Sequence, residues 1–138
     1  MPDFERYPFI AADSTLDEAS LQPHLPIRLT YRDHSVATSG LLDTGAAVNV
    51  LPYQVGVDLG AMWEQQGTVL QLTGNLAHFE ARALLVWAAV GEFAPVRLVF
   101  AWTRAADVPL LLGQVNFFME FDACFYRSRL FFEIHPKT

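Results

Sequence analysis

The sequence predicts a mainly β domain, a small barrel or sandwich with one or two short helices. Several segments alternate apolar and polar residues, turn-forming residues recur between these segments, and 138 residues are enough for one hydrophobic core. Hydrophobic residues make up 52% of the chain and charged residues 17%. This balance excludes an intrinsically disordered protein, which needs low hydrophobicity and high charge.

Residues 1–26 differ from the rest and are predicted to form an irregular N-terminal extension to a domain that spans residues 27–138. The segment contains five acidic residues and four prolines without regular periodicity, which is typical of an irregular arm. Residues 14–20 are compatible with a short helical turn, because Ser14 or Thr15 can cap its first residues. The sequence assigns this extension no function.

The first half of the domain is predicted to be a hairpin followed by a short helix. Its opening strand alternates apolar and polar residues, the pattern of a half-buried strand. Gly56 and Gly60 weaken the helix, because glycine lowers helix propensity. The expected elements are a strand at 27–31, a turn at 33–35, a strand at 36–42, an apolar segment at 46–51 and a short helix within 53–62.

The second half continues the β pattern and ends in a phenylalanine-rich hairpin. Six phenylalanines lie between residues 117 and 132, where they either pack in the core or form a dimer interface. The expected elements are a hairpin of 68–72 and 76–90 with its tip at Gly74 and Asn75, a strand at 95–102, an apolar run at 109–113, helical turns within 114–121, and a closing hairpin of 123–126 and 129–134.

Composition excludes several classes of function. The net charge of −6 and the pI near 5.0 leave no basic stripe for a nucleic-acid partner. The longest apolar stretch, residues 83–90, is shorter than the roughly 20 residues of a membrane helix. The N-terminus lacks the basic start and apolar run of a secretory signal. We therefore expect a cytoplasmic protein with no membrane partner.

Motifs for metal, serine and cysteine chemistry are missing. The four histidines are scattered without the spacing of a zinc site, and no Gly-x-Ser-x-Gly motif occurs. The single cysteine, Cys124, lies between apolar neighbours and is expected to be a buried structural thiol. The sequence thus predicts no metal site.

The sharpest chemical feature is Asp43-Thr44-Gly45 at the end of an apolar strand. An ionised carboxylate is costly to bury unless it is hydrogen-bonded or paired, so apolar neighbours on both sides indicate a carboxylate that is held in place. Gly45 lets backbone amides approach that carboxylate, since no Cβ intrudes. By itself the triplet is also compatible with an ordinary Asx turn at a strand end.

The wider context resembles the retropepsin-like aspartic proteases, and matches their cellular and bacterial members best. These proteins carry an apolar strand, then Asp-Thr-Gly-Ala, then further apolar residues, as residues 40–52 do here. Late in their chain an apolar-apolar-Gly segment precedes a short helix, as Leu111-Leu112-Gly113 does here. A candidate flap hairpin lies between the two motifs. The resemblance covers residues 27–134 and implies a closed β-barrel of the acid protease type.

The resemblance also implies a mechanism and a stoichiometry. One chain supplies one aspartate and the active site needs two, so catalysis would require a homodimer in which Asp43 meets its own copy. The two carboxylates would activate a water that hydrolyses a peptide bond, with no metal or organic cofactor. Thr44 would link the two loops, Gly45 and Ala46 would support the site, and Gly113 would pack behind it.

Substrate binding is implied for the flap and for the residues after the motif. The candidate flap tip is Thr73-Gly74-Asn75-Leu76, which contains one glycine and is equally compatible with plain surface. Ala47 and Val48 follow the motif, and Val48, Leu76 and Val108 are candidate apolar pocket residues.

Two departures from the family pattern leave a second function open. Many retroviral members have an acid at the position of Ala47 and an arginine at the position of Gln114, two groups that commonly pair. Their joint loss leaves no buried unpaired charge, but it removes an acid that helps to bind peptide backbone. The alternative to an endopeptidase is therefore a catalytically weak dimerisation or peptide-binding module. The natural substrate, its cleavage specificity and the organism are not encoded in any of these features.

Overall fold

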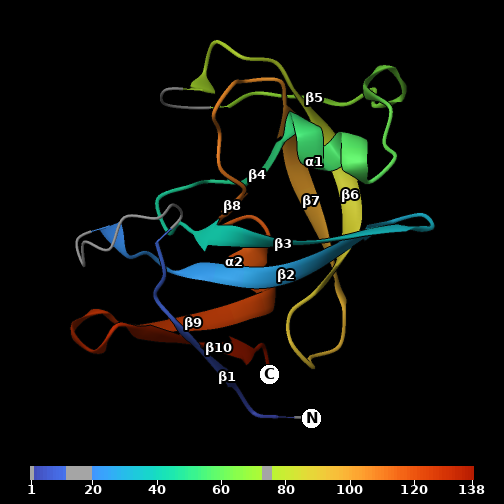
Figure 1. Cartoon of the computed structure of the whole chain (residues 1–138). Helices are drawn as coiled ribbons and strands as arrows, with labels where there is room; N and C mark the ends of the chain where they lie inside the picture. Colours follow the sequence, from blue (N-terminus) through green and yellow to red (C-terminus); the bar gives the residue numbers. More distant parts are fainter. Residues whose placement is uncertain (1, 12–19, 73–75) are drawn as a thin grey trace.

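The computed structural model describes residues 2–11, 20–72 and 76–138, and its architecture is a closed β-barrel with a second, smaller sheet (Figure 1). Six strands run around the barrel in the order β2-β3-β8-β4-β7-β6, and β6 pairs with β2 to close it. The predicted all-β fold is thereby confirmed. The barrel strands are β2 (His24–Tyr31), β3 (His34–Leu42), β4 (Asn49–Pro52), β6 (Ala81–Ala89), β7 (Val96–Thr103) and β8 (Leu111–Leu112), with β5 (Val69–Leu70) added at β6.

The barrel interior is filled by alternate residues of its strands. Leu25, Ile27 and Leu29 of β2 are buried while the residues between them face outward, the period-two pattern of a half-buried strand. Leu98 and Phe100 follow the same rule in the first part of β7, whereas residues 100–103 at its end are all buried. The hairpin of β2 and β3 is as predicted, although β2 begins three residues earlier, at His24. The core is therefore specified largely by side-chain alternation.

The smaller sheet has the order β1-β10-β9 and corrects the expectation of an irregular N-terminal segment. Strand β1 (Glu5–Pro8) pairs antiparallel with β10 (Phe131–Pro136), which pairs with β9 (Phe121–Tyr126). In Figure 1 this sheet lies beneath β2. The Arg6 Nη2 atom donates to Glu133 Oε2 at 2.6 Å, and Tyr7 stacks on Phe132. These contacts join residues about 127 positions apart, so a four-residue strand carries no local signal of them.

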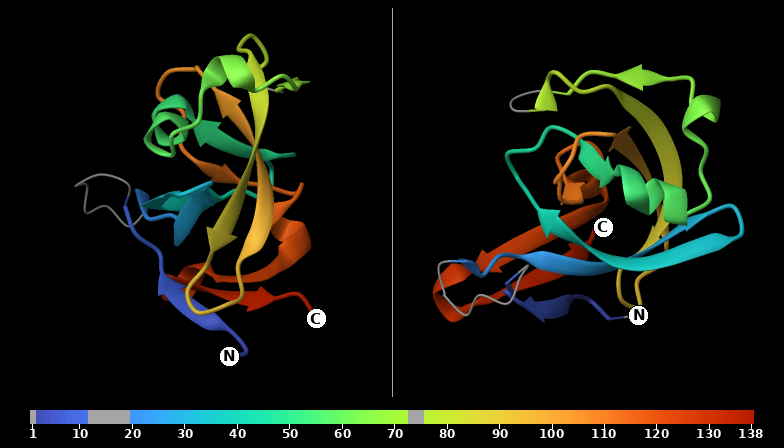
Figure 2. Two further views of the ribbon diagram at one scale, coloured as in Figure 1. Left: turned by 90° about the vertical axis from the view of Figure 1, so that its right-hand side faces the viewer. Right: turned by 45° about the horizontal axis from the view of Figure 1, so that its top comes forward.

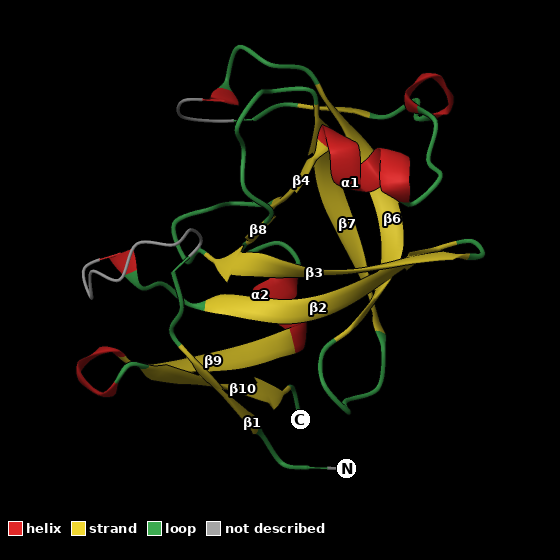
Figure 3. Ribbon diagram, viewed as in Figure 1, coloured by secondary structure: helices red, strands yellow, loops and turns green. Residues whose placement is uncertain are grey.

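Helices are short, as the sequence predicts (Figure 3). Helix α1 (Tyr53–Asp58) contains Gly56, and the position requires glycine because a Cβ there would overlap the indole ring of Trp102. Helix α2 (Phe117–Glu120) follows the late apolar run, and 3-10 helices occupy Trp63–Gln65 and Arg127–Arg129. The second of these makes the turn between β9 and β10. No helix in the described ranges has the length and apolarity to cross a membrane.

The structure also decides where the strand predicted for 76–90 begins and how the terminal phenylalanines pack. The strand predicted for 76–90 begins only at Ala81, because residues 76–79 form a turn in which Phe79 N donates to Leu76 O. The expected helical turn at 14–20 falls almost wholly outside the described residues. Of the six terminal phenylalanines, three are buried, two are half-buried and one is exposed: Phe117, Phe121 and Phe132, then Phe118 and Phe131, then Phe125. Phe118 also packs against the core, so core packing accounts for four of the six.

The ion pair between β1 and β10 makes stability depend on pH in a defined direction. The Arg6 guanidinium hydrogen bond holds the pKa of Glu133 below its usual value of 4.5, with a smaller contribution from His135. A lowered folded-state pKa stabilises the protein above pH 4.5, and this stabilisation is lost as the pH falls through the folded-state value. We expect Glu133→Gln to destabilise the protein at pH 7 and the gap from wild type to close in acid. Thermal melts of both proteins from pH 7 downward measure this difference in stability. A difference that does not change with pH would contradict the prediction. The control is Glu64→Gln, at an exposed glutamate.

Candidate active site

Asp43 lies where β3 leaves the barrel. Strand β3 runs parallel to β8, with Leu41 beside Leu111 and Leu42 beside Leu112. The Asp43 backbone N–H continues this pairing and donates to Leu112 O at 3.0 Å. The two sequence motifs, 70 residues apart, are thus neighbouring strands of one sheet. In Figure 1 the loop that follows Leu42 leads from β3 to β4.

The carboxylate of Asp43 is held by the backbone of its own loop. Gly45 N donates to Asp43 Oδ1 at 2.9 Å, and Ala46 N donates to the Asp43 backbone oxygen at 3.1 Å. A Cβ at Gly45 would lie 3.3 Å from Oδ1, tighter than most such contacts. Asp43 is half-buried, while Thr44 and Gly45 are exposed. The side chain is therefore fixed in direction yet open to solvent on one side.

Gly113 packs directly behind this loop. A Cβ at Gly113 would lie 2.6 Å from Val48 O and 2.7 Å from Ala46 O, closer than real Cβ atoms approach backbone oxygens. The loop is tied to the same segment by two further bonds, from Gln114 N to Ala46 O and from Val115 N to Ala47 O, each 2.9 Å. Only glycine leaves room for this packing.

Two asparagines, the buried Asn49 and the half-buried Asn116, connect the two motifs to β7, a role that the sequence does not predict. Asn49 is fully buried; its Oδ1 accepts from Gly113 N at 2.8 Å and its Nδ2 donates to Val99 O at 3.1 Å. The same Nδ2 lies 3.2 Å from Asn116 Oδ1, which also accepts from Val99 N. The signal was present, since Asn49 is the one polar residue in an apolar run, but its partners are at least 50 positions away.

A cavity of about 350 Å³ opens beside Asp43. It gathers six of the site residues expected from the sequence, namely Asp43, Gly45, Ala46, Ala47, Val48 and Leu76. The other four lining residues were not among the expected site residues: Val50, Gln71, Leu72 and Leu111. Val108 does not line the cavity; it packs against the apolar cluster that contains Val50 and Leu72. The cavity is thus apolar apart from one carboxylate and one amide side chain.

The expected flap is described only in part. Thr73, Gly74 and Asn75 lie outside the described residues, so their role in covering a substrate stays a prediction. Leu76, the last residue of the expected tip, lines the cavity. Gln71 Nε2 donates to Ala77 O at 3.2 Å and so connects the two sides of this segment.

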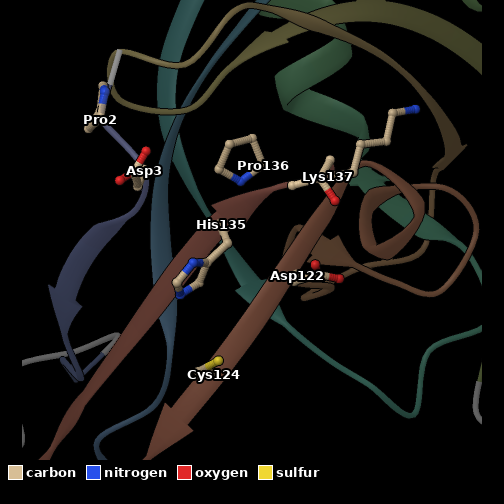
Figure 4. Close-up of a pocket in the computed structure, with 8 residues that line it drawn as sticks. Pro2, Asp3, Asp122, Cys124, His135, Pro136 and Lys137 are labelled. Atoms are coloured by element: carbon tan, nitrogen blue, oxygen red, sulfur yellow. The ribbon is translucent and has the colours of Figure 1, made fainter.

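A larger cavity, about 580 Å³, lies on the smaller sheet (Figure 4). Figure 4 shows Asp122 and Cys124 on β9 beside His135 on β10. Cys124 is exposed, contrary to the expected buried thiol, because it alternates with Ala123, which packs against the core. No group of three or more His, Cys, Asp or Glu side chains within the described ranges is placed to hold a metal ion. Because the two motifs meet at Asp43, the cavity of about 350 Å³ beside Asp43 is the candidate active site.

Comparison with solved structures supports the fold. No protein-family model matches the sequence, and no curated protein matches it. Among solved structures, the chain is similar to a retropepsin-like aspartic protease from Rickettsia conorii, with a TM-score of 0.62 over 96% of this chain and 92% of that chain. The fold is retropepsin-like. Because the sequence identity is 13%, this likeness establishes the fold alone, and an argument about activity must rest on the residues around Asp43.

In this fold, one very short strand brings two distant parts of the chain together at the candidate site. Figure 2 shows the barrel strands curving around the interior. Strand β8 has only two residues, yet it pairs with both β3 and β4 and so brings the late motif against the loop between them. The site is built on two adjacent strand ends, which hold a side chain more rigidly than a free loop does.

Proposed function

We propose that the protein is an aspartic endopeptidase that acts as a homodimer. The observation that carries the proposal is the Asp43 carboxylate, oriented by Gly45 N at 2.9 Å at the edge of an apolar cavity, on a retropepsin-like fold. A carboxylate so placed serves general acid–base chemistry when a second carboxylate shares its proton. The chain offers one Asp-Thr-Gly motif, so the second carboxylate is the copy of Asp43 in the other subunit.

The reaction proceeds by activation of water between the two aspartates. Two carboxylates a few ångströms apart do not both ionise cheaply, so the pair holds one proton. The ionised member takes a proton from water, and the protonated member donates a hydrogen bond to the substrate carbonyl. Water then attacks the carbonyl carbon, and a proton passes from the pair to the leaving nitrogen.

The substrate is an extended peptide with apolar side chains next to the bond that is cut. Val48, Val50, Leu72, Leu76 and Leu111 line the cavity at Asp43 and provide an apolar surface for such a side chain. Burial of a valine-, leucine- or phenylalanine-sized side chain contributes roughly 1.5–3 kcal/mol. A charged side chain packed against these five residues loses its hydration, and their apolar side chains offer it no partner.

The test is cleavage of a peptide library between about pH 3 and pH 7, with and without a statine-type transition-state mimic. We expect cuts beside apolar residues and inhibition at one inhibitor molecule per two chains. A folded protein that cleaves no peptide in the library, and binds no statine, would refute the endopeptidase.

We expect activity at mildly rather than strongly acidic pH. Two-domain pepsin relatives have a serine or threonine at the position of Ala46, whose hydroxyl helps to stabilise the carboxylate. Ala46 supplies only a backbone N–H, which donates to the main-chain oxygen of Asp43. The carboxylate of Asp43 therefore has one hydrogen-bond donor fewer than in those relatives. A rate profile that peaks well below about pH 3 would contradict this expectation.

The second candidate function is peptide binding with little catalysis. It is favoured by Ala47, which lines the cavity and has no carboxylate to accept a peptide N–H. This candidate predicts that the statine mimic and its uncleaved peptide analogue bind equally well. An enzyme instead binds the transition-state mimic at least about a hundredfold more tightly than the substrate.

A further inference from the structure

The peptide unit between Thr44 and Gly45 is hydrogen-bonded on both sides. Its N–H, from Gly45, donates to Asp43 Oδ1 at 2.9 Å. Its carbonyl, from Thr44, accepts from the side-chain Nε2 of Gln114 at 2.8 Å. The Gln114 amide is thus separated from the Asp43 carboxylate by a single peptide group.

Peptide geometry couples these two bonds. The group is planar and trans, so its carbonyl and its N–H point in opposite directions and turn together. A donor that fixes the Thr44 carbonyl therefore also fixes the direction from which Gly45 N–H reaches the carboxylate. Hydrogen bonds in such a chain polarise one another, so the Gln114 bond also strengthens the bond to Asp43 Oδ1.

The main chain of Gln114 is held in place independently of its side chain. Gln114 N donates to Ala46 O at 2.9 Å. The preceding residue, Gly113, donates its N–H to Asn49 Oδ1 and packs closely against two loop carbonyls. The Gln114 side chain itself is exposed and contributes little to the core. Its removal is therefore expected to leave the fold intact.

We propose that Gln114 is a positioning residue for Asp43, acting through the Thr44–Gly45 peptide group. The kinetic consequence rests on the proposed function, because it assumes that Asp43 activates water. The structural consequence, a stronger and better directed hydrogen bond from Gly45 N to Asp43, holds whether or not the protein cleaves peptides.

The kinetic experiment compares Gln114→Met with Gln54→Met. Methionine keeps the length of glutamine but has no N–H to donate. Gln54 also donates one side-chain hydrogen bond, to Asp58 on α1, and is the matched control. We expect Gln114→Met to lower kcat by roughly three- to tenfold, the worth of about one hydrogen bond, with KM changed by less than about twofold. A kcat equal to that of the control, or a loss confined to KM, would overturn the proposal.

A second experiment needs no catalysis and follows the Gly45 amide proton by nuclear magnetic resonance. A stronger hydrogen bond moves an amide proton downfield, so we expect its signal to shift upfield in Gln114→Met and further upfield in Gln114→Glu at neutral pH. Glutamate has the same length, but its ionised carboxylate only accepts and repels the Thr44 carbonyl. An unchanged Gly45 signal in both variants would overturn the proposal.

The two readouts distinguish the failure of each idea. If wild type cleaves no peptide but the Gly45 signal shifts as expected, the proposed function fails and the positioning role stands. If wild type is active and Gln114→Met dissociates the dimer, as measured by sedimentation, while the Gly45 signal stays in place, then Gln114 is merely an interface residue and the positioning role fails.

Discussion

Asp43→Asn is expected to lower peptide cleavage by about 10⁴-fold or more while leaving the protein folded. Asparagine keeps the shape of aspartate and still accepts a hydrogen bond from Gly45 N through Oδ1, the contact that orients the native side chain at 2.9 Å. It cannot carry or share the proton that the water-activating pair requires. The half-buried position of Asp43 limits the change in stability. Initial rates on the best library peptide, together with thermal melts, measure both expectations.

The matched control is Asp58→Asn, which removes an exposed carboxylate on α1 and is expected to leave cleavage unchanged. Mixing wild-type and Asp43→Asn chains tests the stoichiometry. If each site needs two Asp43 residues, activity follows the square of the wild-type fraction and falls to about a quarter at equal amounts. A site within one chain would fall only to about half. Equal cleavage by wild type and Asp43→Asn would assign the activity to a contaminant or to another residue.

How much of the molecule is predictable from the sequence depends on how local each signal is. The hairpin of β2 and β3 is predictable because alternation over eight or nine residues records its burial directly. The placement of Asp43 beside Gly113 follows from two motifs that resemble a known family, and β8 brings these motifs together. In both cases the residues themselves carry the pattern.

The parts that the sequence does not predict depend on distant partners. Strand β1 has four residues and is stabilised by an ion pair between Arg6 and Glu133 at opposite ends of the chain. The asparagine at position 49 is recognisable as unusual, but its bonds to Gly113 and Val99 appear only once the barrel has closed. The hydrogen bond from Gln114 to Thr44 belongs to the same class, since its partners are 70 residues apart. Local periodicity reports which residues are buried, but not which polar groups pair across the chain.

Gly113→Ala is expected to lower both stability and activity, because it changes packing at the point where the two motifs meet. The added Cβ would lie 2.6 Å from Val48 O and 2.7 Å from Ala46 O, and both atoms belong to the backbone that carries the loop. A side chain turns away from such a contact, but a backbone carbonyl moves only with its segment. Overpacking of this kind costs about 1–3 kcal/mol. Displacement of Ala46 and Val48 also moves Asp43, and small misplacements of a catalytic group cost roughly a hundredfold in rate.

The matched control for this prediction is Gly67→Ala, because a Cβ at Gly67 would meet nothing within 4 Å. Denaturant unfolding measures the stability of both variants, and initial rates at a pH where wild type is active measure their cleavage. We expect Gly67→Ala to match wild type in both, and Gly113→Ala to lose stability and activity together. The backbone at neither glycine has a positive φ, so a difference between the two variants reports space and not conformational strain. If Gly113→Ala lost stability but kept its full rate, the close packing would support the barrel without positioning Asp43, and the late motif would have no part in the chemistry.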